Sequence, residues 1–206
     1  TVFVSAGMLI NTYLVQPNIV DNDIKDIKPS EELTWDEIKE KYPNVKFPEG
    51  MQLKYAEAYA QNTDLVGWLK IDKLKMDFPI LQTDNDSYYL KRSFTHRYTD
   101  LGNPFLAHAN SIEPLDRNSI IYGHSTRSSD KIFSKLFDYR TTRGFINNPI
   151  IEFNTIYHDY KWKVYAVFIT NATTAEDNGY FFNYVWTNIS EASFEQIGRA
   201  SCRERV

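Results

Sequence analysis

The residues Tyr122, Gly123 and His124 place an imidazole directly after a short apolar segment, residues 120–122. An apolar run that stops at a glycine is typical of a buried strand, so we expect His124 at the exposed end of that strand. A histidine in this position can titrate near neutral pH and serve as a general acid or base. For an isolated Gly-His pair, a structural histidine is the simpler interpretation, so the flanking residues must decide.

The residues that follow His124 favour catalysis. Residues 125–130 form a polar loop, and residues 131–139 carry apolar side chains at helical spacing, namely Ile132, Phe133, Leu136 and Phe137. The order of strand, Tyr-Gly-His, polar loop and short amphipathic helix resembles the class B sortases, which are cysteine transpeptidases of Gram-positive bacteria. The resemblance implies that His124 is a catalytic residue.

The resemblance continues in order over about residues 35–195. Residues 66–71 resemble the first strand of the family barrel, and residues 78–86 with 88–90 resemble the second strand and the segment after it. Residues 102–106 resemble the entry to the next strand, and residues 162–170 the strand beyond the histidine helix. The resemblance implies a mainly β fold, a sortase-type closed β-barrel with N-terminal helices, whose last strands are missing from this chain.

The residue patterns themselves also predict a mainly β domain. Residues 65–71 and 76–81 read as strands, and Pro79 indicates an edge or a bulge in the second. Further strands are expected over residues 105–107, 120–122, 150–153, 162–170 and 181–186. Several short strands separated by turn signals indicate a barrel or a sandwich.

Two helices are expected before these strands. Thr34 and Glu37 fit a capping box, and the helix that they start should end before Pro43. A second helix is expected over residues 50–62, with a buried face made of Met51, Tyr55 and Tyr59.

Composition excludes several classes of protein. The chain has 206 residues, 42% of them hydrophobic, which suffices for one domain with a sizeable core. The formal net charge is -4 and no basic stripe follows any element, so nucleic acid is not an expected partner. The single cysteine, Cys202, rules out an internal disulfide and a cysteine-rich zinc site.

No metal or other cofactor is expected. Asp84, Asn85 and Asp86 lack the glycine and glutamate that would complete a calcium loop. The other histidines lie in polar, turn-like surroundings without metal-ligand spacing, which is typical of exposed loop histidines; they are His96, His108 and His158.

The N-terminal residues suggest a membrane attachment. Residues 1–20 carry no charge and are mostly apolar up to Val15, but the run is shorter than the roughly 20 apolar residues of a membrane span. We interpret residues 1–20 as the remnant of a single N-terminal anchor in the cell membrane, with the catalytic domain extracellular. An amphipathic helix packed on the domain would explain the same pattern. Residues 21–33 are then a charged linker, and residues 34–196 an incomplete sortase catalytic domain.

Residues 197–206 do not fit the family. The resemblance implies a nucleophilic cysteine at the end of a late strand, typically as Thr-Leu-Ser-Thr-Cys, and an essential arginine on the next strand. No apolar run precedes Cys202, and Arg203 and Arg205 follow it too closely to belong to another strand. We interpret this segment as a non-homologous tail. The other interpretation is a relocated nucleophile whose thiol pKa the neighbouring arginines would lower.

The resemblance also implies a reaction and its partners. A cysteine thiolate attacks the threonine carbonyl in the C-terminal sorting signal of a surface protein, similar to Asn-Pro-x-Thr, and an amine of the peptidoglycan precursor resolves the thioacyl enzyme. His124 would protonate the leaving amine and deprotonate the incoming one. Asp86 and Leu90 fall where substrate contacts are expected, and this chain itself is expected to be inactive. Two other hypotheses stay open: a non-catalytic peptide-binding β-barrel, and an unrelated β-barrel interaction domain.

Overall fold

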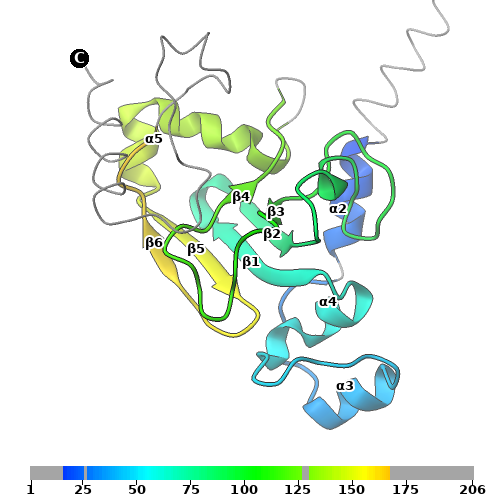
Figure 1. Ribbon diagram of the computed structural model, residues 1–206. Helices are drawn as coiled ribbons and strands as arrows, with labels where there is room; N and C mark the ends of the chain where they lie inside the picture. Colours follow the sequence, from blue (N-terminus) through cyan, green and yellow to red (C-terminus); the bar gives the residue numbers. More distant parts are fainter. Residues whose placement is uncertain (1–15, 26, 127–129, 168–206) are drawn as a thin grey trace, which may run out of the picture.

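The computed structural model describes residues 16–25, 27–126 and 130–167 (Figure 1). Within them the α-helices are α2 Gln16–Lys25, α3 Trp35–Lys41, α4 Ala56–Gln61 and α5 Thr142–Asn147. The 3-10 helices are η2 Leu53–Tyr55, η3 Asp72–Leu74, η4 Tyr88–Leu90 and η5 Ile132–Arg140. The strands are β1 Leu65–Ile71, β2 Met76–Leu81, β3 Phe105–Leu106, β4 Ile121–Tyr122, β5 Ile150–Thr155 and β6 Lys161–Lys163.

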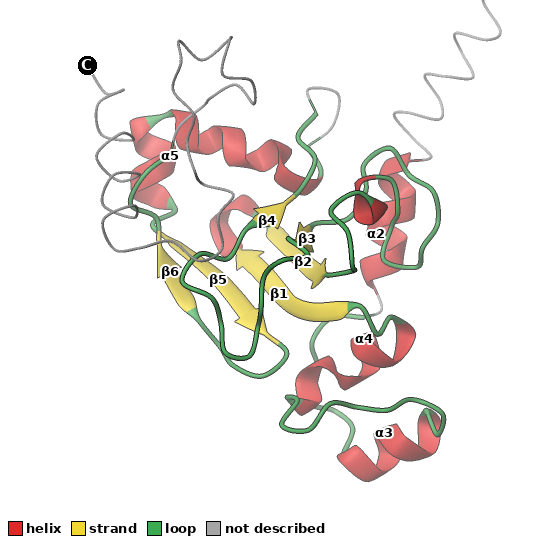
Figure 2. Ribbon diagram, viewed as in Figure 1, coloured by secondary structure: helices red, strands yellow, loops and turns green. Residues whose placement is uncertain are grey.

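The described strands form one sheet in the order β4-β3-β2-β1-β5-β6, which curls into a half barrel (Figure 2). The central strand β1 pairs antiparallel with β2 and with β5. The short strand β3 runs parallel to β2 and antiparallel to β4. The predicted mainly β class is therefore confirmed, while the strand expected over residues 181–186 lies outside the described residues.

The strands β1 and β2 cover the residues predicted for them. Pro79 faces Trp68 of β1, and β2 meets β3 only at Leu81. On the side away from β1, Pro79 thus has no strand partner within the described part of the chain. Since proline lacks the N–H that a ladder requires, this edge-like position is the one that it tolerates.

The predicted capping box is present at the start of α3. The Glu37 amide donates to Thr34 Oγ1 (3.4 Å), and the Thr34 amide donates to Glu37 Oε2 (2.7 Å). The helix ends at Lys41, before Pro43, as predicted. The next predicted helix starts later than expected, because Gln52 is extended and its N–H donates to the Ile156 carbonyl (2.8 Å).

The segment expected to be a linker is partly helical. Helix α2 continues to Lys25 and contacts the domain through Val20 and Asp23, both of which are buried. Its apolar contacts are Val20 and Ile24, and one such pair with a buried carboxylate is too short a pattern to reveal the helix in the sequence.

Two hydrophobic clusters cover the two faces of the sheet. One joins β1, β2 and β3 to the N-terminal helices through Ile38, Tyr55 and Trp68. The other joins the sheet to η5 through Ile80, Leu106 and Ile132. The short strands β3 and β4, which lead to the candidate site, are held between these two clusters.

The expected strand over residues 162–170 is shorter in the structure. β6 ends at Lys163, residues 164–167 are not a strand, and residues 168–170 lie outside the described residues. The helix expected over residues 131–139 is present but adopts 3-10 geometry over Ile132–Arg140.

Candidate functional site

His124 lies just beyond the end of β4, separated from Tyr122 only by Gly123, as the sequence predicted. Its side chain is half-buried. A Cβ at Gly123 would lie 2.6 Å from the Phe133 ring, so only glycine lets η5 approach the strand this closely. The predicted helix therefore packs directly beside the histidine.

The first turn of η5 fixes the backbone around His124. The Phe133 amide donates to the His124 carbonyl (3.0 Å). The Ser134 hydroxyl accepts from the Thr126 amide (2.9 Å) and donates to the Thr126 carbonyl (3.0 Å). These bonds hold the backbone of His124 and of Thr126 against η5. The loop between Thr126 and η5 includes residues 127–129, which the structure does not describe.

The imidazole is oriented by the backbone of a distant segment. His124 Nε2 lies 2.8 Å from the carbonyl oxygen of Leu90, the last residue of η4. A carbonyl oxygen can only accept, so Nε2 carries the proton in this contact. In the neutral ring the other nitrogen, Nδ1, is then the acceptor.

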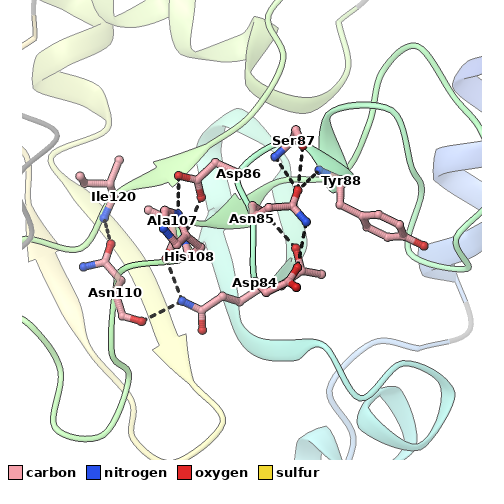
Figure 3. Close-up of polar contacts among 11 residues, drawn as sticks. Asp84, Asn85, Asp86, Ser87, Tyr88, Ala107, His108, Asn110 and Ile120 are labelled. Carbon is pink, nitrogen blue, oxygen red and sulfur yellow. Dashed lines mark hydrogen bonds and ion pairs between the residues drawn. The ribbon is translucent and has the colours of Figure 1, made fainter.

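Asp86, the other predicted substrate contact, is paired with His108, which follows β3 by two residues. Its carboxylate accepts from the His108 amide (2.7 Å) and lies 2.9 Å from His108 Nδ1 (Figure 3). The loop that carries it is shaped by Asn85 Oδ1, which accepts from the Ser87 and Tyr88 amides. The structure thus brings His124 and Leu90 together but leaves Asp86 paired elsewhere.

His108 was expected to be an ordinary exposed loop histidine, and it does remain about half exposed (51%). Its partner Asp86 lies 22 residues away in the sequence. No local spacing could have predicted the pair. His96 similarly lies within 3.1 Å of the Tyr88 hydroxyl.

Asp100 adds negative charge near His124. The Lys91 ammonium beside it (2.9 Å) holds the pKa of the Asp100 carboxyl below its usual range, with smaller contributions from the Tyr98 hydroxyl and from His124. Asp100 is largely exposed, so solvent screens this field. No sequence pattern singles out Asp100, because its proximity to His124 depends on the fold.

Metal and membrane features are not found in the described part of the chain. Its His, Asp and Glu side chains form no group of three or more that could hold a metal ion. None of its helices is both long and apolar enough to cross a bilayer. The anchor predicted for residues 1–20 lies almost entirely outside the described residues, as do Cys202, Arg203 and Arg205.

No family model matches the chain. Two curated relatives do: sortase B of Staphylococcus aureus is 27% identical over 162 residues (78% of this chain, 64% of the relative). Sortase B of Listeria monocytogenes is 30% identical over 132 residues (64% of this chain, 50% of the relative). The chain therefore spans less than two thirds of the length of these relatives.

Solved structures agree with the sequence relatives. The Staphylococcus aureus sortase B–substrate complex superimposes with a TM-score of 0.65 at 23% identity, covering 82% of this chain and 72% of that one. A sortase B complexed with triglycine superimposes with a TM-score of 0.64 at 26% identity, covering 73% of this chain and 66% of that one. The chain is similar in sequence and in fold to the class B sortases. In this sortase-like fold, His124 lies beside η5 and against Leu90.

Proposed function

We propose that the protein acts as a class B sortase, a cysteine transpeptidase. The observation that carries the proposal is the held imidazole of His124, with Nε2 bonded to Leu90 and Nδ1 as the acceptor in the neutral ring. The similarity to sortase B supports a thiol mechanism. A cysteine thiolate adds to the threonine carbonyl of a sorting signal, the C–N bond breaks, and a thioacyl enzyme forms.

His124 serves in both halves of this reaction. The charged imidazole gives its proton to the leaving amine, and the neutral ring takes a proton from the incoming amine. The arginine that the resemblance places on the strand after the nucleophile stabilises the negative charge that develops on the carbonyl oxygen. Asp86 and Leu90 contact the sorting peptide.

The proposed partners are a sorting-signal peptide and a cell-wall amine. They are supported by the sortase B structures solved with a substrate and with triglycine, a peptide that begins with a free amine. We place the catalytic domain outside the cell on a single N-terminal membrane anchor, an assignment supported by the uncharged, apolar character of residues 1–15.

The experiment compares His124→Ala with wild type, in a protein whose residues after Gln196 are replaced by those of a class B sortase. Cleavage of a fluorescent sorting peptide should fall by at least about 100-fold, the typical effect of removing a positioned acid or base. His158→Ala is the matched control, because that histidine is 59% exposed and its only ion pair among the described residues is with Glu113. Near-normal turnover in His124→Ala would remove this residue from the mechanism.

A second candidate is a barrel that binds the peptide without cleaving it. The observation that favours it is the sequence around Cys202, the only cysteine, which has no strand-like run before it. Binding of the sorting peptide by the 206-residue chain, without a covalent adduct, would support this function.

A further inference from the structure

The Leu90 carbonyl belongs to a rigid stretch of backbone. The Asn103 amide donates to the Tyr89 carbonyl (3.0 Å), and the Thr99 amide donates to the Lys91 carbonyl (3.1 Å). Tyr89 itself is 1% exposed, and its hydroxyl donates to Asp64 (2.7 Å). The residues on both sides of Leu90 are therefore bonded to the segment that leads into β3, which fixes the direction of the Leu90 carbonyl.

Gly102 lets these two segments lie against each other. It has a left-handed backbone (φ 61°), and a Cβ there would lie 2.4 Å from the Tyr89 oxygen and 2.7 Å from the Leu90 oxygen. Contacts this short are impossible without moving backbone, so any side chain at position 102 must displace the carbonyl that holds His124.

We infer that Gly102 is a positioning residue for His124: it keeps the Leu90 carbonyl in place to hold the Nε2 proton, so that Nδ1 is the nitrogen that exchanges protons. Its functional meaning rests on the acid–base role proposed above. In each cycle Nδ1–H donates its proton to the leaving amine, and Nδ1 then takes one proton from the incoming amine. The Nε2–H bond to Leu90 stays intact throughout.

Asp100 is a charged side chain whose field acts on His124, and two other donors engage one of its carboxylate oxygens, Oδ1. Lys91 and the Tyr98 hydroxyl lie 2.9 and 3.1 Å from the Asp100 carboxylate. The Phe133 amide bonds the His124 backbone rather than its ring. Leu90 is thus the hydrogen-bond partner of the imidazole within the described structure.

The test uses the full chain labelled with ¹⁵N-histidine and studied by NMR where the imidazoles are neutral. In wild type, His124 should carry its proton on Nε2, and that proton should exchange with water about tenfold more slowly than that of a free histidine side chain, as one hydrogen bond allows. In Gly102→Ala the protection should disappear. A proton on Nδ1 in wild type, or unprotected exchange at Nε2, would overturn the inference even if the variant did not fold.

Gly50→Ala is the matched control. Gly50 also has a left-handed backbone (φ 75°), but a Cβ added there would meet nothing within 4 Å, so it reports the backbone cost without the collision. In Gly50→Ala the Nε2 proton of His124 should stay protected from exchange.

Gly102→Asn is the second variant, because asparagine tolerates positive φ while still placing a Cβ against the carbonyl. Unchanged protection in a folded Gly102 variant would also refute the role. Proton exchange is measured without turnover. The positioning role of Gly102 can therefore be refuted while the acid–base role of His124 stands, and the acid–base role can be refuted while the positioning role stands.

Discussion

Ile132, the first residue of η5, has a left-handed backbone (φ 51°) although it is β-branched. Such a conformation costs about 1–3 kcal/mol. Its side chain is fully buried (0% exposed), which contributes about 1.5–3 kcal/mol in return. The two effects are of similar size, so core packing holds the strained residue in place. This matters for the site because the next residue, Phe133, donates to the His124 carbonyl.

At this residue we predict an inverted order of stability. Ile132→Ala should lower the free energy of unfolding by about 2–5 kcal/mol through the lost packing. Ile132→Gly should be less harmful than Ile132→Ala by up to about 1 kcal/mol, because glycine relieves the strain at positive φ. Urea unfolding of the two variants measures the difference.

Ile38 provides the control, since it is equally buried (1% exposed) but lies inside the α-helix α3. There glycine should be worse than alanine by about 1 kcal/mol. The same order at both positions would show that Ile132 is not strained.

Helix α2 is held on the domain by a buried charge. The Asp23 side chain is 3% exposed and accepts from the Thr95 hydroxyl (2.7 Å) and from Arg97. Burial alone would raise the pKa of Asp23, but hydrogen bonds from Ser93, Thr95 and Arg97 outweigh it and hold the pKa below the usual 3.8. Because the pKa of Asp23 is depressed in the folded state, the stability that its charge contributes is fully present above pH 3.8. That stability is lost as the pH falls through the folded-state pKa.

We therefore predict that acid weakens the docking of α2. Below the folded pKa of Asp23, the amide resonances of α2 should shift toward those of an undocked helix. Asp23→Asn should show the same shift already at neutral pH, because hydrogen bonds to a charged group contribute about 1.5–3 kcal/mol.

Asp21→Asn is the control within the same helix. Its ion pair with Lys131 (2.7 Å) is solvent-exposed, so its removal should cost no more than about 1 kcal/mol. A wild-type α2 that stays docked well below pH 3.8 would contradict the role of Asp23.

Across the whole molecule, β4 and β6 form the two outer strands of the described sheet. Trp162 (43% exposed) and Ile150 (42% exposed) leave apolar surface near the β6 edge. Edges of this kind favour association between chains. We predict that the 206-residue chain is prone to aggregate and forms no thioacyl adduct on Cys202 when it is mixed with a sorting peptide.

Intact-protein mass spectrometry tests this prediction. A version with a class B sortase sequence after Gln196 should acquire the adduct on its own strand-end cysteine and should stay soluble at higher concentration. Fast alkylation of Cys202 alone would not count, because catalysis needs the thiolate held at the carbonyl with His124 in reach. A thioacyl group on Cys202 would establish it as a relocated nucleophile.

The sequence alone determined the elements whose causes are local. The Thr34 capping box, the strands β1 and β2, and the strand end that presents His124 depend on neighbouring residues and on short apolar periods, which can be read along the chain. Only the tertiary structure decided the contacts between distant segments. Leu90 and His124 are 34 residues apart and Asp86 and His108 are 22 apart, and neither pair leaves a local pattern. The same holds for the salt bridge between Asp23 and Arg97, which docks α2. These contacts exist because β1, β2 and β3 bring separate loops to one edge of the curled sheet, and that geometry depends on the packing of both hydrophobic clusters.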